Sequence, residues 1–205
     1  MRRGPALRTP SHTLLLIATI FGSLASCRSE PQLTGRRLDT EGPPRVLIGT
    51  RHDGAPFDLA ELGGSAEYAL VFFGFTSCPD VCPITLSNLG EVLDHLEDGA
   101  DRVAVVFAAV DPQRDTLEQL STYVRAFDKR ALGVRLDEQQ LAATKESFGL
   151  VVDIHEPEDP ARPDHYAVDH TGTLFLVDAA ARVVLTYPAY TDPGLIAGDL
   201  NQLLG

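Results

Sequence analysis

The sequence predicts an α/β domain in which helices flank a central sheet. Two continuous apolar runs, "YALVFFGF" at 68–75 and "RVAVVFAAV" at 102–110, have the length and composition of buried strands. Each run is followed by a segment whose apolar residues recur at helical spacing, and a strand pair and a closing helix end the chain. A β-α-β half joined to a β-β-α half is the thioredoxin-like arrangement, here with an extra strand region at its N-terminal end.

The first half of the domain begins with a short predicted strand, "RVLIG" at 45–49, and a turn at "RHDG". After the first long strand we expect a helix from Pro83 to Leu96, because leucines recur three or four residues apart and proline suits a first turn. After the second long strand, "DPQRDTLEQLSTYVRAF" predicts a helix that Asp115 and Glu118 cap as a pair. Its apolar face consists of Leu117, Leu120, Val124 and Phe127.

The second half continues with a predicted helix over Glu138–Phe148 and a strand at "LVVDI". The acidic, proline-rich segment "HEPEDPARPD" that follows is predicted to be a loop. "TLFLVD" and "RVVLTYP" form a strand pair joined by three alanines, and Pro193–Leu204 is the closing helix.

The N-terminal segment, residues 1–26, is predicted to be a lipoprotein signal peptide. Three arginines precede an apolar run from Thr13 to Ala25, and the run ends in "LASC", which resembles a bacterial lipobox. Cys27 would then be the first mature residue and carry lipid; cleavage at a nearby small residue or an uncleaved anchor are the alternatives. Residues 27–44, polar with "EGPP", are predicted to be a flexible tether, and 45–205 the folded domain.

The charge balance narrows the range of partners. The chain has 17 basic and 29 acidic residues, and the predicted signal peptide holds three arginines and no acid. The remainder, with 14 basic and 29 acidic residues, has a formal charge of −15. Such a domain is unsuited to nucleic acid, which requires a basic surface, and to electrostatic binding of anionic lipid. We therefore expect an exported protein that a lipid anchor holds on the membrane, facing the periplasm or the cell exterior.

Two cysteines, Cys78 and Cys82, lie in "FTSCPDVCP", where the first long strand passes into its helix. Ligands bind at this carboxyl edge in open α/β sheets. The pair could be a disulfide, a redox dithiol or a metal clamp, and a helix N-terminus that lowers thiol pKa would favour the last two. A four-residue separation makes an inert local disulfide the least favoured reading, because disulfides stabilise more when they close longer loops.

A metal site needs a further ligand, and histidine is the commonest choice. "DHYAVDHTGTLFLVD" supplies His165 and His170, which point to opposite faces of an extended segment, so we expect only one to reach the cysteines. Asp80 or Asp169 could complete a zinc site, and Asp169 could equally support another ligand or belong to a turn.

Three motifs in order, "FTSCPDVCP", "VDPQRDT" and "YAVDHTGTLFLVD", resemble the Sco/SenC family of copper proteins over roughly residues 45–205. The resemblance implies a membrane-tethered, thioredoxin-like protein that binds one copper through Cys78, Cys82 and His170. It also implies a role in assembling the binuclear copper centre of cytochrome c oxidase, with the copper-bearing oxidase subunit as partner. Other copper chaperones or thioredoxin-like reductants are further expected partners.

The donor chemistry agrees with this resemblance, because thiolates and imidazole suit copper, including Cu(I). Two enzymatic alternatives use the same cysteines. One is a thiol–disulfide reductase that keeps a client's copper-ligand cysteines reduced, and the other is a peroxide-reducing enzyme. A loop and helix cap suffice to explain "DPQRDT", and the sequence leaves specific roles for Asp80, Asp111, Asp115 and Asp169 open.

Overall fold

The computed structural model describes residues 1, 32–38, 42–64 and 66–205. Everything described from residue 32 onward belongs to one compact unit, Pro31–Gly205. The predicted signal peptide and the predicted lipid site at Cys27 lie outside the described residues.

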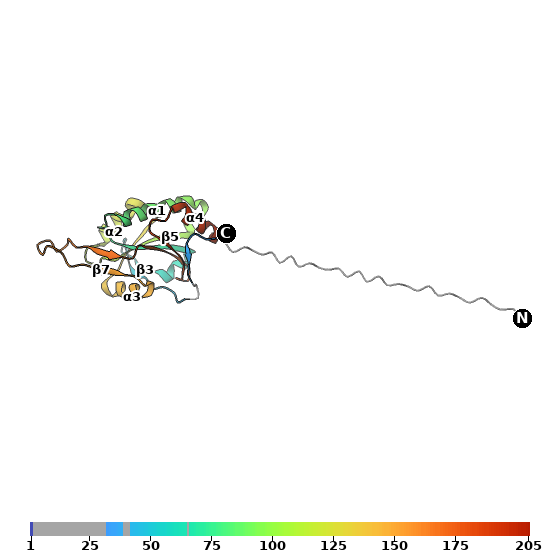
Figure 1. Ribbon diagram of the computed structural model, residues 1–205, viewed down its shortest axis with the longest axis horizontal. Coiled ribbons are helices and arrows are strands. Elements are labelled where there is room, and N and C mark those ends of the chain that lie inside the picture. The colour runs from blue at the N-terminus through green and yellow to red at the C-terminus, as the bar shows by residue number, and fades with distance from the viewer. Residues whose placement is uncertain (2–31, 39–41, 65) are drawn as a thin grey trace. The chain divides into compact units, whose positions relative to one another are not determined.

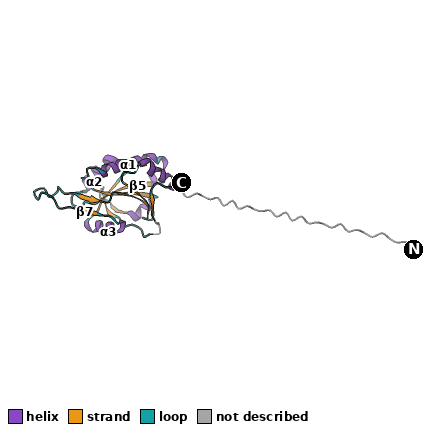
Figure 2. Cartoon of the chain, in the orientation of Figure 1, coloured by secondary structure: helices purple, strands orange, loops and turns teal. Residues whose placement is uncertain are grey.

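An eight-stranded sheet forms the centre of this unit (Figure 2). The strand order is β1-β10-β9-β4-β5-β6-β2-β3, in which β4, β5 and β6 run parallel and the other neighbours are antiparallel. The strands are β1 (Arg36–Arg37), β2 (Ile48–Arg51), β3 (Pro56–Asp58), β4 (Tyr68–Gly74), β5 (Val103–Ala109), β6 (Leu132–Arg135), β9 (Thr173–Asp178) and β10 (Val183–Pro188).

Helices lie on both faces of the sheet (Figure 1). The helices α1 (Val81–His95), α2 (Leu117–Phe127) and α4 (Pro193–Leu204) cover one face, and α3 (Glu138–Phe148) covers the other. Two short 3₁₀ helices, Leu59–Gly64 and Glu97–Arg102, complete the set. This is the thioredoxin-like α/β arrangement that the sequence predicts.

Strand β4 divides its side chains between two apolar cores, because successive residues of a strand point to opposite faces. Leu70 and Phe72 belong to the core under α1, α2 and α4, whereas Val71 and Phe73 belong to the core under α3. All four side chains are fully buried, which explains why the strand is apolar without alternation.

The register of β4 and β5 positions the site. The two strands pair in parallel from Tyr68 opposite Val103 to Gly74 opposite Ala109, so both end at the same edge of the sheet. The cysteine segment and the segment that starts at Asp111 therefore leave the sheet side by side.

The element bounds depart from the predictions in several places. Helix α1 begins at Val81 and includes Pro83 in its first turn, and the strand predicted at 45–49 is β2 at 48–51. The capping box of α2 consists of Thr116 and Gln119, so the predicted pair of Asp115 and Glu118 was wrong. The Asp115 carboxylate instead accepts hydrogen bonds from Thr76.

The predicted tether also needs correction where the structure describes it. Arg36–Arg37 form β1, which pairs with β10 at the edge of the sheet. The backbone N–H groups of Thr34 and Gly35 each donate to the buried carboxylate of Asp199, at 2.8 Å. Residues 32–38 thus belong to the folded unit, because edge pairing and a buried acceptor satisfy their backbone groups.

A second, two-stranded sheet consists of β7 (Val152–Ile154) and β8 (Val168–His170), which pair with Val152 opposite His170. The acidic loop of residues 155–167 joins the two strands. The sequence predicted β7 but not β8, and β8 brings a histidine to the cysteine edge.

Candidate metal centre

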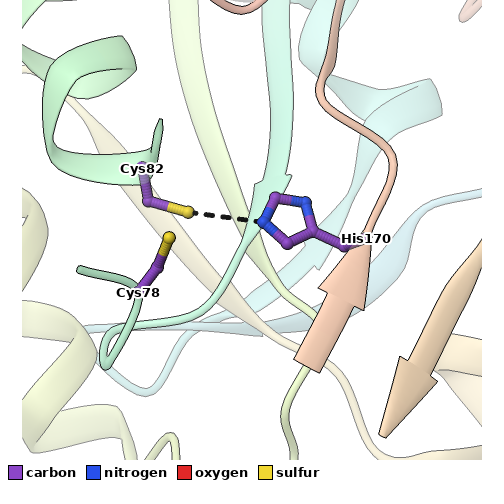
Figure 3. A group of neighbouring side chains, drawn as sticks. All are labelled: Cys78, Cys82 and His170. Atoms are coloured by element: carbon purple, nitrogen blue, oxygen red, sulfur yellow. Dashed lines mark hydrogen bonds between the residues drawn. The ribbon is translucent and has the colours of Figure 1, made fainter. Parts of the chain in front are cut away.

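Three side chains converge at the carboxyl edge of β4. The two sulfurs of Cys78 and Cys82 and a ring nitrogen of His170 all lie within 4.8 Å of one another (Figure 3). Cys82 Sγ is 3.7 Å from His170 Nε2. In the described part of the chain, this is the one group of three or more such residues able to hold a metal ion.

The cysteines occupy the turn between β4 and α1. The Cys78 N–H donates to the Phe75 carbonyl at 3.2 Å, which closes the turn, and Cys78 remains half-buried. Cys82 lies in the first turn of α1 and is fully buried. The pair therefore has one sulfur toward the surface and one within the core.

Gly74 makes room for the buried sulfur, a role that the sequence predictions missed. A Cβ atom at Gly74 would lie 2.5 Å from Cys82 Sγ and 2.8 Å from the Phe107 ring. Real Cβ atoms do not approach so closely, so only glycine fits there without moving the sulfur. The signal in the sequence was a glycine within a bulky apolar run, directly before the cysteine segment.

His170 is oriented for binding by its neighbours. Its Nδ1 lies 3.2 Å from the Thr171 carbonyl, so Nδ1 carries the proton and the lone pair of Nε2 faces the sulfurs. The rings of Phe72 and Phe75 make edge contacts with the imidazole, with centroids 6.1 and 5.7 Å away. Burial lowers the pKa of His170, so the ring is neutral and available as a ligand at neutral pH.

The Cys82 thiol differs from the expectation for a helix N-terminus. Burial raises its pKa far above the ordinary value, and the nearby Cys78 adds to this effect. Desolvation of the thiolate outweighs the hydrogen bond from the Phe75 backbone, which lowers the pKa, so the predicted lowering of thiol pKa is wrong for Cys82. A metal ion that binds there must displace the thiol proton.

The other candidate residues lie elsewhere. His165 is in the 155–167 loop and is not part of the converging group. Asp169 points away, with a 76% exposed side chain whose carboxylate lies 2.8 Å from His155 Nε2. Asp80 precedes α1, is exposed, and makes no side-chain capping hydrogen bond. Neither aspartate supplies a fourth ligand.

The other two aspartates that the sequence analysis singled out, Asp111 and Asp115, are buried. Asp115 accepts hydrogen bonds from the backbone and hydroxyl of Thr76, next to the cysteine turn. Asp111 pairs with Arg114 and accepts a hydrogen bond from the Tyr166 hydroxyl, at 2.7 Å. "DPQRDT" therefore contacts both segments that carry the converging side chains, beyond the loop and cap expected from the sequence.

The donor set fits copper. Two sulfur donors and one imidazole are the soft and intermediate ligands that copper, and Cu(I) in particular, prefers. Structural zinc sites almost always have four protein ligands, and this group offers three.

Comparison with known proteins gives a consistent result. The SCO1/SenC family model matches residues 48–205. The mitochondrial SCO2 homolog of Mus musculus is 32% identical over 190 residues, covering 86% of this chain and 71% of that protein.

Solved structures agree with this match. The copper-bound structure of ScoI from Bradyrhizobium japonicum superposes with a TM-score of 0.69 at 30% identity, over 78% of this chain and 99% of that one. Apo Sco1 from Thermus thermophilus gives the same TM-score and identity, over 84% and 97% of the two chains.

Proposed function

Because the chain belongs to the SCO1/SenC family, we propose that it binds copper and acts in the assembly of cytochrome c oxidase. More specifically, it carries copper to the binuclear copper centre, and the copper-bearing oxidase subunit is its partner. The observation that supports the proposal most is the convergence of Cys78, Cys82 and His170 within 4.8 Å.

In this proposal copper is cargo, and the chain's own groups explain how it is held. His170 offers a neutral Nε2 that its Nδ1 hydrogen bond has already oriented. Cys82 loses its thiol proton when copper binds, and the resulting thiolate faces the metal from the buried side.

Release starts from the opposite side. Cys78 and His170 are half-buried, so incoming partner ligands reach copper next to them while Cys82 still holds it. A carrier needs this combination, because the metal must be retained during transit and remain accessible for transfer.

Metal analysis of the purified full-length protein tests the ligand set. Reduced protein is expected to bind one copper per chain at this site, and oxidation of Cys78 and Cys82 to a disulfide is expected to abolish that binding. A disulfide sulfur is a poor ligand because it is not a thiolate. Full copper occupancy after verified oxidation would place the site elsewhere.

A second candidate function is a thiol–disulfide reductase that keeps the partner's copper-ligand cysteines reduced. The unequal exposure of the cysteines favours it, because half-buried Cys78 could attack a client disulfide and release one client thiol. Cys82, once its thiol proton is removed, would then attack the Cys78 sulfur, which releases the second client thiol and leaves a Cys78–Cys82 disulfide. This reaction needs both sulfurs and does not need His170.

The location is part of the proposal. We infer that residues 1–26 are a signal peptide and that lipidated Cys27 anchors the exported protein, as "LASC" indicates. Within the described residues, no helix is both long and apolar enough to cross a membrane. Labelling with a radioactive fatty acid is expected to mark the wild-type protein and not Cys27→Ala, and equal label in both would refute lipidation at Cys27.

A further inference from the structure

The position of His170 depends on contacts outside the main sheet. Its strand β8 pairs only with β7 in the described sheets, whereas the cysteines follow directly from the central strand β4. His170 and Cys82 are 88 residues apart in the chain. Other contacts must therefore set the distance between the imidazole and the sulfurs.

One such contact joins Tyr166, four residues before His170, to the end of β5. The Tyr166 hydroxyl donates to the fully buried Asp111 carboxylate at 2.7 Å. Arg114 Nε donates to the other oxygen of the same carboxylate. Arg114 Nη1 donates to the backbone carbonyls of Tyr166, at 2.9 Å, and of Asp164, at 3.2 Å.

The Arg114 guanidinium also lies over two aromatic rings. Its carbon lies 3.7 Å from the centroid of the Tyr166 ring and 5.5 Å from that of Phe75. Phe75 in turn contacts the His170 ring edge-on, with the two ring planes at 90°. Arg114 thus contacts the histidine-bearing segment directly and supports the imidazole through Phe75.

Asp115, which directly follows Arg114 in the chain, contacts the cysteine turn. Asp115, only 1% exposed, accepts hydrogen bonds from the Thr76 N–H at 3.1 Å and the Thr76 hydroxyl at 2.6 Å. Thr76 is two residues before Cys78. Residues 111–115, here called the clamp segment, therefore contact both the cysteine turn and the end of the loop that leads into β8, the strand that carries His170.

We propose that the clamp segment positions the copper ligands, with Arg114, Asp111 and Tyr166 fixing His170 relative to the sulfurs that Asp115 and Thr76 hold. This inference rests on the ligand set of the proposed function. Arg114, Asp111, Asp115 and Tyr166 are positioning residues, since they act through His170 and the cysteine turn.

Capping of α2 does not account for these contacts. Thr116 and Gln119 already form a complete capping box. Two buried carboxylates cost desolvation energy, and their donors come largely from the two ligand-bearing segments. Supporting groups of this kind hold a ligand in the geometry that the metal needs.

Two conservative variants test the proposal. Tyr166→Phe removes the hydroxyl bond to Asp111 and keeps the ring, and Arg114→Lys keeps the charge but loses the fork that bridges Asp111 and the Tyr166 carbonyl. Each is expected to weaken Cu(I) binding by the full-length protein about tenfold, measured against a chromogenic Cu(I) chelator. Arg162→Lys, an exposed position in the same loop, is the matched control and should leave binding unchanged.

A double-mutant cycle separates positioning from general stability. If Arg114 and Tyr166 act through the imidazole, their effects should disappear in a His170→Ala background. An equal loss in that background would overturn the proposal, as would wild-type affinity in both single variants. If Arg114→Lys does not fold, as judged by thermal unfolding, Tyr166→Phe alone decides.

The cycle also distinguishes failure of this inference from failure of the proposed function. Weaker copper binding in His170→Ala with unchanged binding in Tyr166→Phe and Arg114→Lys would remove only the positioning role. Unchanged binding in His170→Ala itself would overturn both, because the imidazole would not be a ligand.

Discussion

The buried sulfur of Cys82 defines the site at the scale of single residues. It fills the space beside Gly74 where any side chain would begin, and it lies 3.7 Å from His170 Nε2. Because its thiolate would be desolvated, the thiol keeps its proton until a metal replaces it. Metal binding at this site therefore depends on the packing of Cys82 against Gly74 and on release of the Cys82 thiol proton.

Gly74→Ala tests the packing. The new methyl group must displace Cys82 Sγ or Phe107, so we expect a loss of about 1–3 kcal/mol in the free energy of unfolding and weaker copper binding. Urea denaturation and Cu(I) competition measure the two effects. Gly198→Ala, a helix position with nothing within 4 Å of the added Cβ, is the control and should not weaken binding. Unchanged copper affinity in Gly74→Ala would refute the proposed fit.

Proton release predicts a pH dependence of copper binding. The pKa of Cys82 is raised, so its thiol is protonated at neutral pH and each copper bound displaces that proton. The apparent affinity should then rise by at least about tenfold per pH unit between pH 7 and 8. His170 has a lowered pKa and does not compete for a proton in this range.

Proton release can be measured directly, with a pH indicator in weakly buffered solution during Cu(I) titration. Cys82→Ser should release at least one proton fewer per copper than the wild type. An affinity that does not change with pH would contradict the assignment of Cys82 as a ligand that is protonated when metal-free.

At the scale of elements, the sequence predicted the helices and strands whose bounds are set by the pattern of neighbouring residues. Helix α3 spans the residues for which it was predicted, Glu138–Phe148, and local groups hold both of its ends: Asp137 and Gln140 form a capping box, and Gly149 ends the helix with a φ of +67°. Strands β6 and β8 were missed, since runs of four and three residues carry too few positions to show alternation.

The N-terminal strand shows where local pattern fails. Polar residues with proline and glycine predict a tether, yet a buried carboxylate in α4 fixes this segment. Asp199 accepts hydrogen bonds from the Thr34 and Gly35 N–H groups and from the Tyr187 hydroxyl. The partner lies more than 160 residues away in the chain, which no local pattern can reveal.

Asp199→Ala should release this segment. Removal of the carboxylate leaves three donors unpaired, of which the Gly35 N–H and the Tyr187 hydroxyl are buried, so we expect a loss of about 1–3 kcal/mol in the free energy of unfolding. Amide hydrogen exchange at Thr34 and Gly35 should accelerate, whereas copper affinity should not change. Asn201→Ala, at an exposed position of the same helix, is the control. Unchanged exchange at both amides would show that Asp199 does not hold the segment.

At the scale of the whole molecule, the fold brings three distant segments to one sheet edge. The cysteine turn follows β4, the clamp segment follows β5, and His170 is the last residue of β8, which pairs with β7. The order of strands and helices was enough to predict the fold class, and the three motifs pointed to the converging residues. The links between the segments, such as Arg114 to the Tyr166 carbonyl, are tertiary contacts and could not be predicted from spacing.

The arrangement also bears on the choice between carrier and reductase. Both functions use the two sulfurs, but only a carrier needs the imidazole. His170 is oriented by its own hydrogen bond and by two aromatic rings. A histidine that takes no part in thiol–disulfide exchange would not need this support, so the arrangement favours the carrier.

The most direct test of copper delivery is the state of the oxidase copper centre in cells that carry His170→Ala, compared with Cys78→Ser and Cys82→Ser. His170→Ala keeps both thiols, so thiol exchange should survive while copper binding weakens about 10–100-fold or more. Spectroscopic assay of the binuclear copper centre should then show its loss in all three variants, with partial recovery of His170→Ala in copper-supplemented medium. A fully assembled copper centre in His170→Ala cells, with loss only in the two cysteine variants, would contradict the carrier function and establish the reductase.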